Sequence, residues 1–478
     1  MKETQAPVDA PDQTAEHNEA ELRREVLRDP AVRALVFSRM ATALGLATLS
    51  YGAMVYLATV GASQITISVM GATRYLAALL FGIGGGALAE AMSKRTAMVT
   101  AYALQAAACF IIPTIWGTSV SSLVVLVFTV AMLGQIATPA LKSATALVST
   151  SAMVAVVAAI VTVANGIGAA LGSAFLAPIL INVSTMRVLI YVAGVVLLLG
   201  AVRALKLPPE ENTASLRQAS REIAWRETVP TLRRTADWLL ANRKVGAMIL
   251  VGSMVLALFD GLNTLMPVYV RDVLNSNPTN TVFILAPGGI GFIVGTSLGP
   301  WLMDRKGERA LGVSALMILS LGFALFGLID LVWPILAPIS PLRLLNLVGF
   351  DLSPQIQAAG LISILTALGS TGAAAAVQTY INRYVLLARQ PATFGMQEVL
   401  DNAITLTAVI VFGAVATALG PRIVFVLAPP VLVVVVVWLI RVCFRVTDQD
   451  PPEARAILRV LLDRAPVVPP PPAIGDRS

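Results

Sequence analysis

The chain has 478 residues, of which 57% are hydrophobic and only 13% are charged, and its mean hydropathy is +0.80. Soluble globular chains carry roughly 25% charged residues. No soluble fold of this size can hide so large an apolar fraction, because much of any folded chain stays at its surface. The composition excludes a soluble globular protein and indicates that the natural solvent of the chain is lipid.

The net charge of +7 does not indicate a nucleic-acid partner, because the basic residues are scattered between apolar runs. Anionic lipid headgroups explain them better. The two cysteines, Cys109 and Cys443, lie in apolar runs, so a disulfide framework is not expected. The single histidine, His17, lies in a polar tail. No metal site, no cofactor and no histidine-based chemistry within the membrane are therefore expected.

The chain begins with a charged segment, residues 1–29, which has no apolar core and does not resemble a cleavable signal peptide. Apolar runs long enough to cross a membrane follow, since about 20 apolar residues are needed. About twelve spans are predicted, six on each side of a polar linker that we expect to lie at the membrane surface. The runs cover residues 32–59, 65–90, 96–115, 121–145, 153–181, 186–205, 245–270, 280–303, 310–333, 357–386, 395–418 and 422–444.

These runs predict an all-α membrane protein with two six-helix bundles. Between the ninth and tenth runs, residues 334–357 are apolar but contain four prolines, which favours an interfacial helix or a re-entrant loop over a span. The predicted parts are a cytoplasmic N-terminal tail at 1–29, bundles at 30–205 and 245–445, a cytoplasmic linker at 206–244, and a cytoplasmic C-terminal tail at 446–478.

The basic residues predict the orientation of the spans. Of the 34 Lys and Arg residues, 29 fall on the tails and loops of one side, and four fall on the other side. Cytoplasmic segments carry the excess of positive charge. Both termini are therefore expected in the cytoplasm of a multi-pass plasma-membrane protein, which would be a bacterial inner-membrane protein.

The loop after the eighth span, Pro300 to Arg309, reads PWLMDRKGER. It resembles the loop signature of the major facilitator superfamily, in which Asp-Arg, a spacer, a glycine and basic residues follow three apolar residues. The loop after the second span, Gly86 to Arg95, reads GALAEAMSKR and repeats this frame with substitutions. Two copies at matching places fit two repeated halves. The resemblance assigns gating roles to Glu90, Lys94, Arg95, Asp304, Arg305, Gly307 and Arg309.

The resemblance covers residues 30–445 and implies two helical bundles related by pseudo-two-fold symmetry, alternating access and a monomer. Three segments, at 262–269, 286–291 and 394–398, are similar to the branch of macrolide and enterobactin exporters, which implies export of an amphipathic molecule. Two departures weaken this: residues 390–393 replace a basic residue and glycine, and Gln135 has no arginine beside it. Proton antiport is therefore left open.

Glycines recur at four-residue spacing in the second, fifth and eighth spans. Small residues at this spacing let helix backbones approach closely. They serve either static packing within a bundle or rocking of these spans. The pairs and triplet are Gly82 and Gly86, Gly168 and Gly172, and Gly291, Gly295 and Gly299.

Placing a charged side chain inside a span costs about 2.5–3.5 kcal/mol of insertion free energy, so each such residue needs an explanation. Arg74 and Asp260 lie near the middle of their spans, on opposite halves, and we expect them to form the charged centre of a transport pathway. Arg39, Glu398 and Asp401 are nearer to span ends and are expected to be structural. The residues predicted to line the pathway are Arg74, Asp260, Asn263, Gln135 and Gln378.

The sequence thus predicts a secondary transporter that moves a small solute and contacts membrane lipids. A lipid or lysophospholipid transporter of the same fold is an alternative, and a non-transporting receptor or scaffold is another. An enzyme is not expected, because no cluster of catalytic residues is visible and no ATP-binding Gly-Lys-Ser/Thr motif is present.

Overall fold

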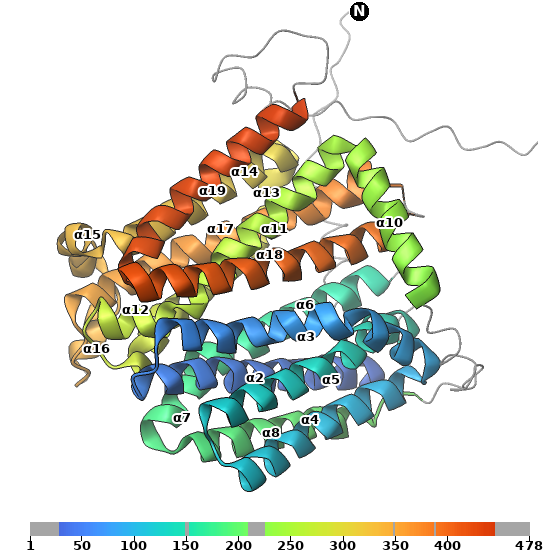
Figure 1. Cartoon of the computed structure of the whole chain (residues 1–478), viewed down its shortest axis with the longest axis horizontal. Helices are drawn as coiled ribbons and strands as arrows, with labels where there is room; N and C mark the ends of the chain where they lie inside the picture. Colours follow the sequence, from blue (N-terminus) through green and yellow to red (C-terminus); the bar gives the residue numbers. More distant parts are fainter. Residues whose placement is uncertain (1–27, 149–152, 209–224, 348, 387–388, 445–478) are drawn as a thin grey trace, which may run out of the picture. The chain divides into compact units, whose positions relative to one another are not determined.

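The computed structural model describes residues 28–148, 153–208, 225–347, 349–386 and 389–444 (Figure 1). All regular structure within these ranges is helical. The C-terminal tail, nearly all of the N-terminal tail and the centre of the linker, which sequence analysis predicts to be cytoplasmic, lie outside the described residues.

The first half of the chain forms helices that follow the predicted spans. Most begin where a Ser, Thr or Asp side chain accepts a hydrogen bond from an amide of the first turn, as Ser63 does for α3 and Ser119 for α5. The fifth span contains a π-helical segment, Leu171–Leu176. The helices are α2 (Pro30–Thr59), α3 (Gln64–Ala91), α4 (Lys94–Trp116), α5 (Val120–Leu147), α6 (Val154–Ala170), α7 (Ala177–Val183) and α8 (Met186–Ala204).

The second half contains α10 in the linker and six long or broken spans. The seventh span is interrupted at Leu265, just before Pro267, which has no amide hydrogen to continue the helix. The helices are α10 (Trp225–Ala241), α11 (Arg243–Thr264), α12 (Met266–Asp272), α13 (Thr281–Lys306), α14 (Glu308–Gly327), α15 (Ile329–Leu336), α16 (Arg343–Leu347), α17 (Pro354–Tyr384), α18 (Gln390–Leu419) and α19 (Pro421–Phe444).

The ninth span ends earlier than predicted. Helix α14 stops at Gly327, and the next helical stretch turns away from it by 101°. Arg422 fixes this corner, because its Nε donates to the carbonyl oxygen of Gly327 at 3.0 Å and its Nη1 pairs with Asp330 at 2.6 Å. The prediction that the span runs to residue 333 is therefore wrong, because α15 takes up residues 329–333.

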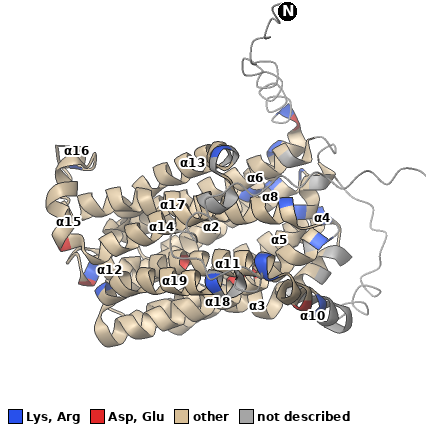
Figure 2. Ribbon diagram, turned by 90° about the horizontal axis from the view of Figure 1, so that it is seen from above, with Lys and Arg blue, Asp and Glu red and all other residues tan. Residues whose placement is uncertain are grey.

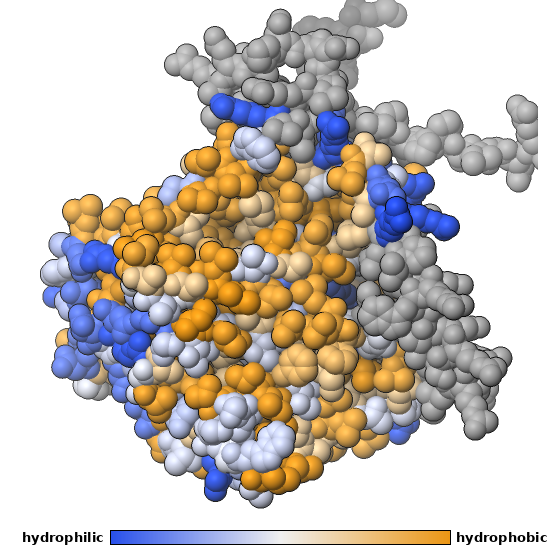
Figure 3. All heavy atoms as spheres, in the orientation of Figure 1, coloured by the Kyte–Doolittle hydropathy of each residue, from blue (hydrophilic) through white to orange (hydrophobic). Residues whose placement is uncertain are grey.

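The described residues contain 11 helices long and apolar enough to cross a membrane, or up to 12 if the bent pair is one span. Most described charged residues lie near helix ends (Figure 2). Apolar residues cover much of the described surface in the view of Figure 3. These features confirm the predicted all-α membrane fold.

The chain divides into two compact units. Unit 1 contains Met1–Pro230, Thr264–Val282 and Val409–Pro421, and unit 2 contains Thr231–Asn263, Phe283–Ala408 and Arg422–Ser478. Helix α12 and the end of α18 thus pack with the helices of the first half. The sequence-based boundaries at 30–205 and 245–445 stay a prediction.

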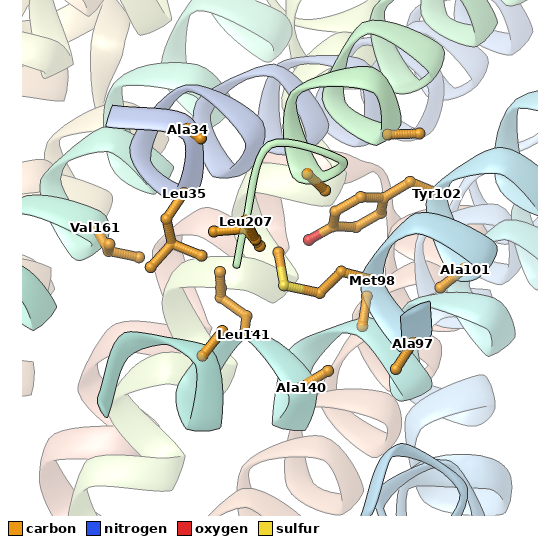
Figure 4. Close-up of a cluster of buried hydrophobic side chains, with 14 of the residues drawn as sticks. Ala34, Leu35, Ala97, Met98, Ala101, Tyr102, Ala140, Leu141, Val161 and Leu207 are labelled. Atoms are coloured by element: carbon orange, nitrogen blue, oxygen red, sulfur yellow. The ribbon is translucent and has the colours of Figure 1, made fainter. Parts of the chain in front are cut away.

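Unit 1 has a tightly packed apolar core between α2, α4, α5 and α6. Leu35, Met98, Tyr102, Leu141 and Leu207 come from different parts of the chain and point toward one another (Figure 4). Their burial joins the end of α8 to the first, third and fourth spans, and each large side chain contributes roughly 1.5–3 kcal/mol.

The glycines of the fifth span allow a close approach to α2. A Cβ added at Gly168 would collide with the carbonyl oxygen of Met40, and one at Gly172 with that of Leu44. In unit 2, Gly291 of α13 lies as close to the carbonyl oxygen of Ile364 in α17. These glycines therefore serve packing inside a unit, and a role in rocking stays a prediction.

We expect Gly172→Val to lower the thermal stability of the purified protein, by about 1–3 kcal/mol, because the new side chain forces α2 and the π-helical segment apart. The measurement is the melting temperature in detergent. Gly84→Val is the matched control, because a Cβ at Gly84 meets no atom within 4 Å. Equal melting temperatures for the two variants would contradict the packing role.

Candidate functional site

Three carboxyl groups gather in unit 2. Asp260 comes from α11, and Glu398 and Asp401 come from α18. The Asp401 carboxyl interacts with the side chains of Ser253 and Gln397 and lies within electrostatic range of Asp260 and Glu398. Among the described residues, Asp401 Oδ1 is buried and receives no hydrogen bond. Neighbouring carboxylates repel one another, and a bound proton or cation relieves that repulsion.

Helix α11 carries Ser253, Asp260 and Asn263 at helical spacing on one face, which we call the polar stripe. Ser253 is buried and donates to the carbonyl oxygen of Ile249 at 3.1 Å. Asn263 is half-buried, and its Nδ2 donates to the carbonyl oxygen of Phe259 at 2.9 Å. Both hydrogen bonds stay within α11.

In unit 1, Arg74 is exposed although it lies near the middle of a span. Its guanidinium group stacks over the ring of Tyr75, with the central carbon 4.5 Å from the ring centroid, and donates to the Tyr75 hydroxyl. A cation over an aromatic face is stabilised by the ring quadrupole. Tyr75 therefore orients an arginine that would be costly if it faced hydrocarbon.

The predicted pathway glutamines differ in their surroundings. Gln135 lies at a close approach of α3 and α5, since a Cβ added at Gly85 would be 2.6 Å from its carbonyl oxygen. Its Nε2 donates to Ala131 of its own helix at 3.3 Å. Gln378 is exposed on α17. Arg74 and Gln135 thus belong to unit 1, whereas Asp260, Asn263 and Gln378 belong to unit 2. A contact between Arg74 and Asp260 stays a prediction.

The two loops that resemble the superfamily signature form matching helix breaks. Helix α13 ends at Lys306 and α14 begins at Glu308, and Gly307 between them has φ of +82°. Only glycine adopts this conformation easily, which explains its place in the signature. In the first copy, Ser93 stands where the signature has glycine.

The side chains of the gating loops are partly described. Ser93 caps α4 by accepting from the amide of Thr96 at 3.2 Å. Lys94 and Arg95 are half-buried. The central carbon of the Arg305 guanidinium lies 4.3 Å from the centroid of the Trp301 ring. The side chains of Glu90, Asp304 and Arg309 lie outside the described residues.

A polar cluster at the end of α2 was not predicted. Arg271 Nη1 donates to the carbonyl oxygens of Ala58 at 3.2 Å and Ala62 at 3.0 Å, and its Nε pairs with Asp272 at 2.6 Å. Asp272 also accepts from Gln64 Nε2 at 2.9 Å. We call these contacts the Arg271 latch. The sequence gives no signal for it, because the partners of Arg271 are backbone carbonyls more than 200 residues away.

The end of α18 reaches the same region of unit 1. The amide of Ile65 donates to Thr417 Oγ1 at 3.0 Å. Gly413 lies so close to Ser68 that a Cβ would collide with the serine hydroxyl. Within unit 1, α12 thus contacts the end of α2, and the end of α18 contacts α3.

The long apolar helices define the class as a multi-pass helical membrane protein. The model of the Major Facilitator Superfamily matches residues 35–359. That is more than half of the chain, and the protein belongs to the Major Facilitator Superfamily. Among curated proteins, no sequence matches this one.

Solved structures share the fold at low identity. A variant of the nucleoside transporter NupG aligns with a TM-score of 0.68 at 12% identity, covering 87% of this chain and 100% of the other. A bacterial homologue of the human lysosomal transporter Spinster aligns with a TM-score of 0.65 at 12% identity, covering 89% of this chain and 99% of the other. A peptide transporter, POT, aligns with a TM-score of 0.65 at 14% identity, covering 89% of this chain and 98% of the other. These similarities establish the fold and leave the solute undetermined.

Proposed function

We propose that the protein exports a small amphipathic solute by alternating access, and that a proton moving the other way drives the export. Membership of the superfamily supports secondary transport in general. The observation that carries the finer proposal is the acidic cluster of Asp260, Glu398 and Asp401. Ionisable groups inside spans mark proton or solute pathways in transporters.

In this proposal, Asp260 and Asp401 accept protons, and Arg74 meets the solute. Protonation removes the repulsion within the cluster and so favours one conformer over the other. Gln135, Asn263 and Gln378 supply polar contacts to the solute. The protein needs no cofactor for this cycle and is expected to work as a monomer among membrane lipids.

The direction and the solute class come from the resemblance to the macrolide and enterobactin exporters. Export of a lipid or lysophospholipid is the second candidate. It is favoured by the exposed apolar side chains of α15, among which Leu331 and Ile335 are each 72% exposed. A receptor without transport activity is the alternative from another class.

A ligand-stabilisation screen on the purified protein, followed by flux in proteoliposomes, tests the proposed function. For each solute that raises the melting temperature, uptake into the proteoliposomes is measured with and without an imposed pH gradient. We expect accumulation that depends on the gradient and collapses when a proton ionophore is added. Binding without flux would favour the receptor, and flux indifferent to the gradient would remove proton coupling.

The loops at 86–95 and 300–309 are proposed to act as a gate on the cytoplasmic side, with contacts that form in one conformer and break in the other. The Arg271 latch lies within unit 1, and we propose that it holds α12 against the end of α2.

We predict that both termini and the linker face the cytoplasm. In a variant lacking the native cysteines, Ser276→Cys is expected to react with an impermeant maleimide in intact cells, and Ser220→Cys only after lysis. The reason is the excess of basic residues on the segments assigned to the cytoplasm. The opposite labelling pattern would show that the orientation is inverted.

A further inference from the structure

The chain between α14 and α17 stays at one end of unit 2. Where these two helices meet, Gly322 lies against Thr366 and Gly372 lies against Ala315, so the helices run antiparallel. The end of α14 and the start of α17 are therefore neighbours, and residues 328–353 connect them at that end. We call these residues the connecting segment. Its short helices α15 and α16 lie together at this end (Figure 1).

An exposed ion pair marks the level of the connecting segment relative to the membrane. Asp330 of α15 pairs with Arg422 near the start of α19, and both side chains are exposed. Charged groups are costly in hydrocarbon, so this pair lies where the apolar core of the membrane meets water. Residues 329–339 leave this point at 101° to α14. Because this is slightly more than a right angle, α15 runs along the membrane boundary and does not project into water.

One side of this helical stretch exposes a row of aliphatic side chains. Leu331 and Ile335 are each 72% exposed, and Ile339 is 69% exposed. Their four-residue spacing places them on the same side of the helix. The other side packs on α17 and is buried at Ile329 and Ala337. The helical stretch is therefore amphipathic in its packing: one side belongs to the bundle, and the other has no protein over it among the described residues.

Helix α16 extends the apolar surface. Leu344 is exposed, and Leu347 is 83% exposed. Residues 331–342 and 344–350 contain no charged residue. Protein interfaces are enriched in aromatic residues and arginine and carry hydrogen bonds. The most exposed side chains here are leucines and isoleucines, which need no such partners and are suited to hydrocarbon.

Side chains satisfy the backbone where the segment turns into α17. Asn346 Nδ2 donates to the carbonyl oxygen of Leu352 at 3.1 Å, and Asn346 Oδ1 accepts from the Leu352 amide at 3.0 Å. Gln357 Nε2 donates to the same carbonyl oxygen at 2.9 Å, and Ser340 Oγ donates to the carbonyl oxygen of Gln357 at 2.8 Å. Backbone groups beside lipid need internal partners of this kind, because hydrocarbon offers none. The turn is therefore suited to surroundings that contain little water.

We propose that the connecting segment is an interfacial anchor that inserts its exposed aliphatic side chains into the adjacent lipid leaflet. Interfacial helices bury their apolar side at the boundary between headgroups and acyl chains. In the predicted orientation this is the outer leaflet, because α14 begins at the loop 300–309 on the cytoplasmic side. The anchor is a permanent contact with the membrane and does not depend on the identity of the cargo. The inserted residues are Leu331, Ile335, Ile339, Leu344 and Leu347.

Nitroxide labels on the full chain in phosphatidylcholine nanodiscs, with one copy in each disc, test the proposal. Ile335→Cys and Leu347→Cys are labelled in a variant lacking the native cysteines. Asp351→Cys is the matched control, because Asp351 is an exposed charged residue of the same segment. Power saturation measures collisions with oxygen, which concentrates in hydrocarbon, and with a water-soluble nickel chelate. We expect the ratio of oxygen to nickel collisions to be several-fold higher at positions 335 and 347 than at 351.

The depth of the labels separates the anchor from other arrangements. Both labels should lie within about 10 Å of the boundary between headgroups and acyl chains. Frequent nickel collisions at both positions would show a surface that faces water until a second copy or another protein covers it. A depth near the middle of the bilayer would show a re-entrant loop. Either result would overturn the proposal.

Removal of the apolar side chains is the second arm of the test. With the label at Leu347→Cys, the pair Leu331→Ser and Ile335→Ser should raise nickel collisions several-fold, because the segment is held less firmly in the lipid. Met317→Ser with Leu321→Ser is the matched control, since both residues are exposed on α14 outside the segment. The melting temperature shows that each labelled variant is folded. Unchanged nickel collisions in the first pair would contradict the anchor.

Discussion

Asp260→Asn is expected to reduce flux driven by a pH gradient by about two orders of magnitude, which corresponds to about 2.7 kcal/mol. An amide has nearly the size of the carboxyl group but cannot exchange a proton, so the cluster with Glu398 and Asp401 loses the step that proton binding would drive. The measurement is flux in proteoliposomes for a solute found by the stabilisation screen. Asp330→Asn is the control, because Asp330 pairs with Arg422 away from the cluster. Flux like that of the wild type in Asp260→Asn would remove Asp260 from the mechanism.

The stability of the same variants tests the predicted partnership of Arg74 and Asp260. If they interact, Arg74→Gln and Asp260→Asn should each destabilise the protein, since each leaves a partner without compensation. The double variant should then recover stability and remain inactive. Additive changes in the free energy of unfolding would show that the two side chains do not interact.

Arg271→Gln is expected to open the Arg271 latch. The carbonyl oxygens of Ala58 and Ala62 lose a charged donor. Hydrogen bonds to charged groups each contribute about 1.5–3 kcal/mol to stability. We expect the labelling rate of Ser68→Cys by a water-soluble maleimide to rise by about tenfold or more. Ser68 is fully buried and lies against Gly413.

Arg187→Gln is the control for the latch, because it removes an exposed basic residue at the start of α8. Labelling of Ser68→Cys should stay unchanged in that background. An unchanged rate in Arg271→Gln as well would show that the latch does not hold this end of unit 1 closed. Full flux in Arg271→Gln would show that the latch is not needed for the transport cycle.

Sequence reasoning located the spans well because their signal is local. Twenty apolar residues with few charges predict a membrane helix wherever they stand. The end of the ninth span was wrong for the same reason: residues 328–336 are as apolar as the span before them. At the turn after Gly327 the structure has contacts from Arg422, nearly 100 residues later in the chain. Hydropathy predicts the length of an apolar segment but not the direction in which it runs.

The candidate site was predicted in part. Asp260 and Asn263 were named from the sequence, and the structure has both on α11. The neighbourhood of Asp401 and Asp260 was missed, because an acidic residue near the start of a helix has an adequate local explanation. Asp401 comes near Asp260 only because α11 packs beside α18, and no local sequence pattern predicts which helices pack together.

The break at Leu265 has a mechanical consequence. The chain passes from unit 2 to unit 1 at this point, between Asn263 and Thr264, where α11 gives way to α12. A second crossing, between Ala408 and Val409, lies inside the unbroken helix α18. If the units reorient, the backbone torsion angles of a few residues at the first crossing can change to allow it. The second crossing lies within a continuous helix that cannot bend in this way. A displacement of α18 near Glu398 and Asp401 would therefore also displace Gly413 and Thr417 and change their contacts.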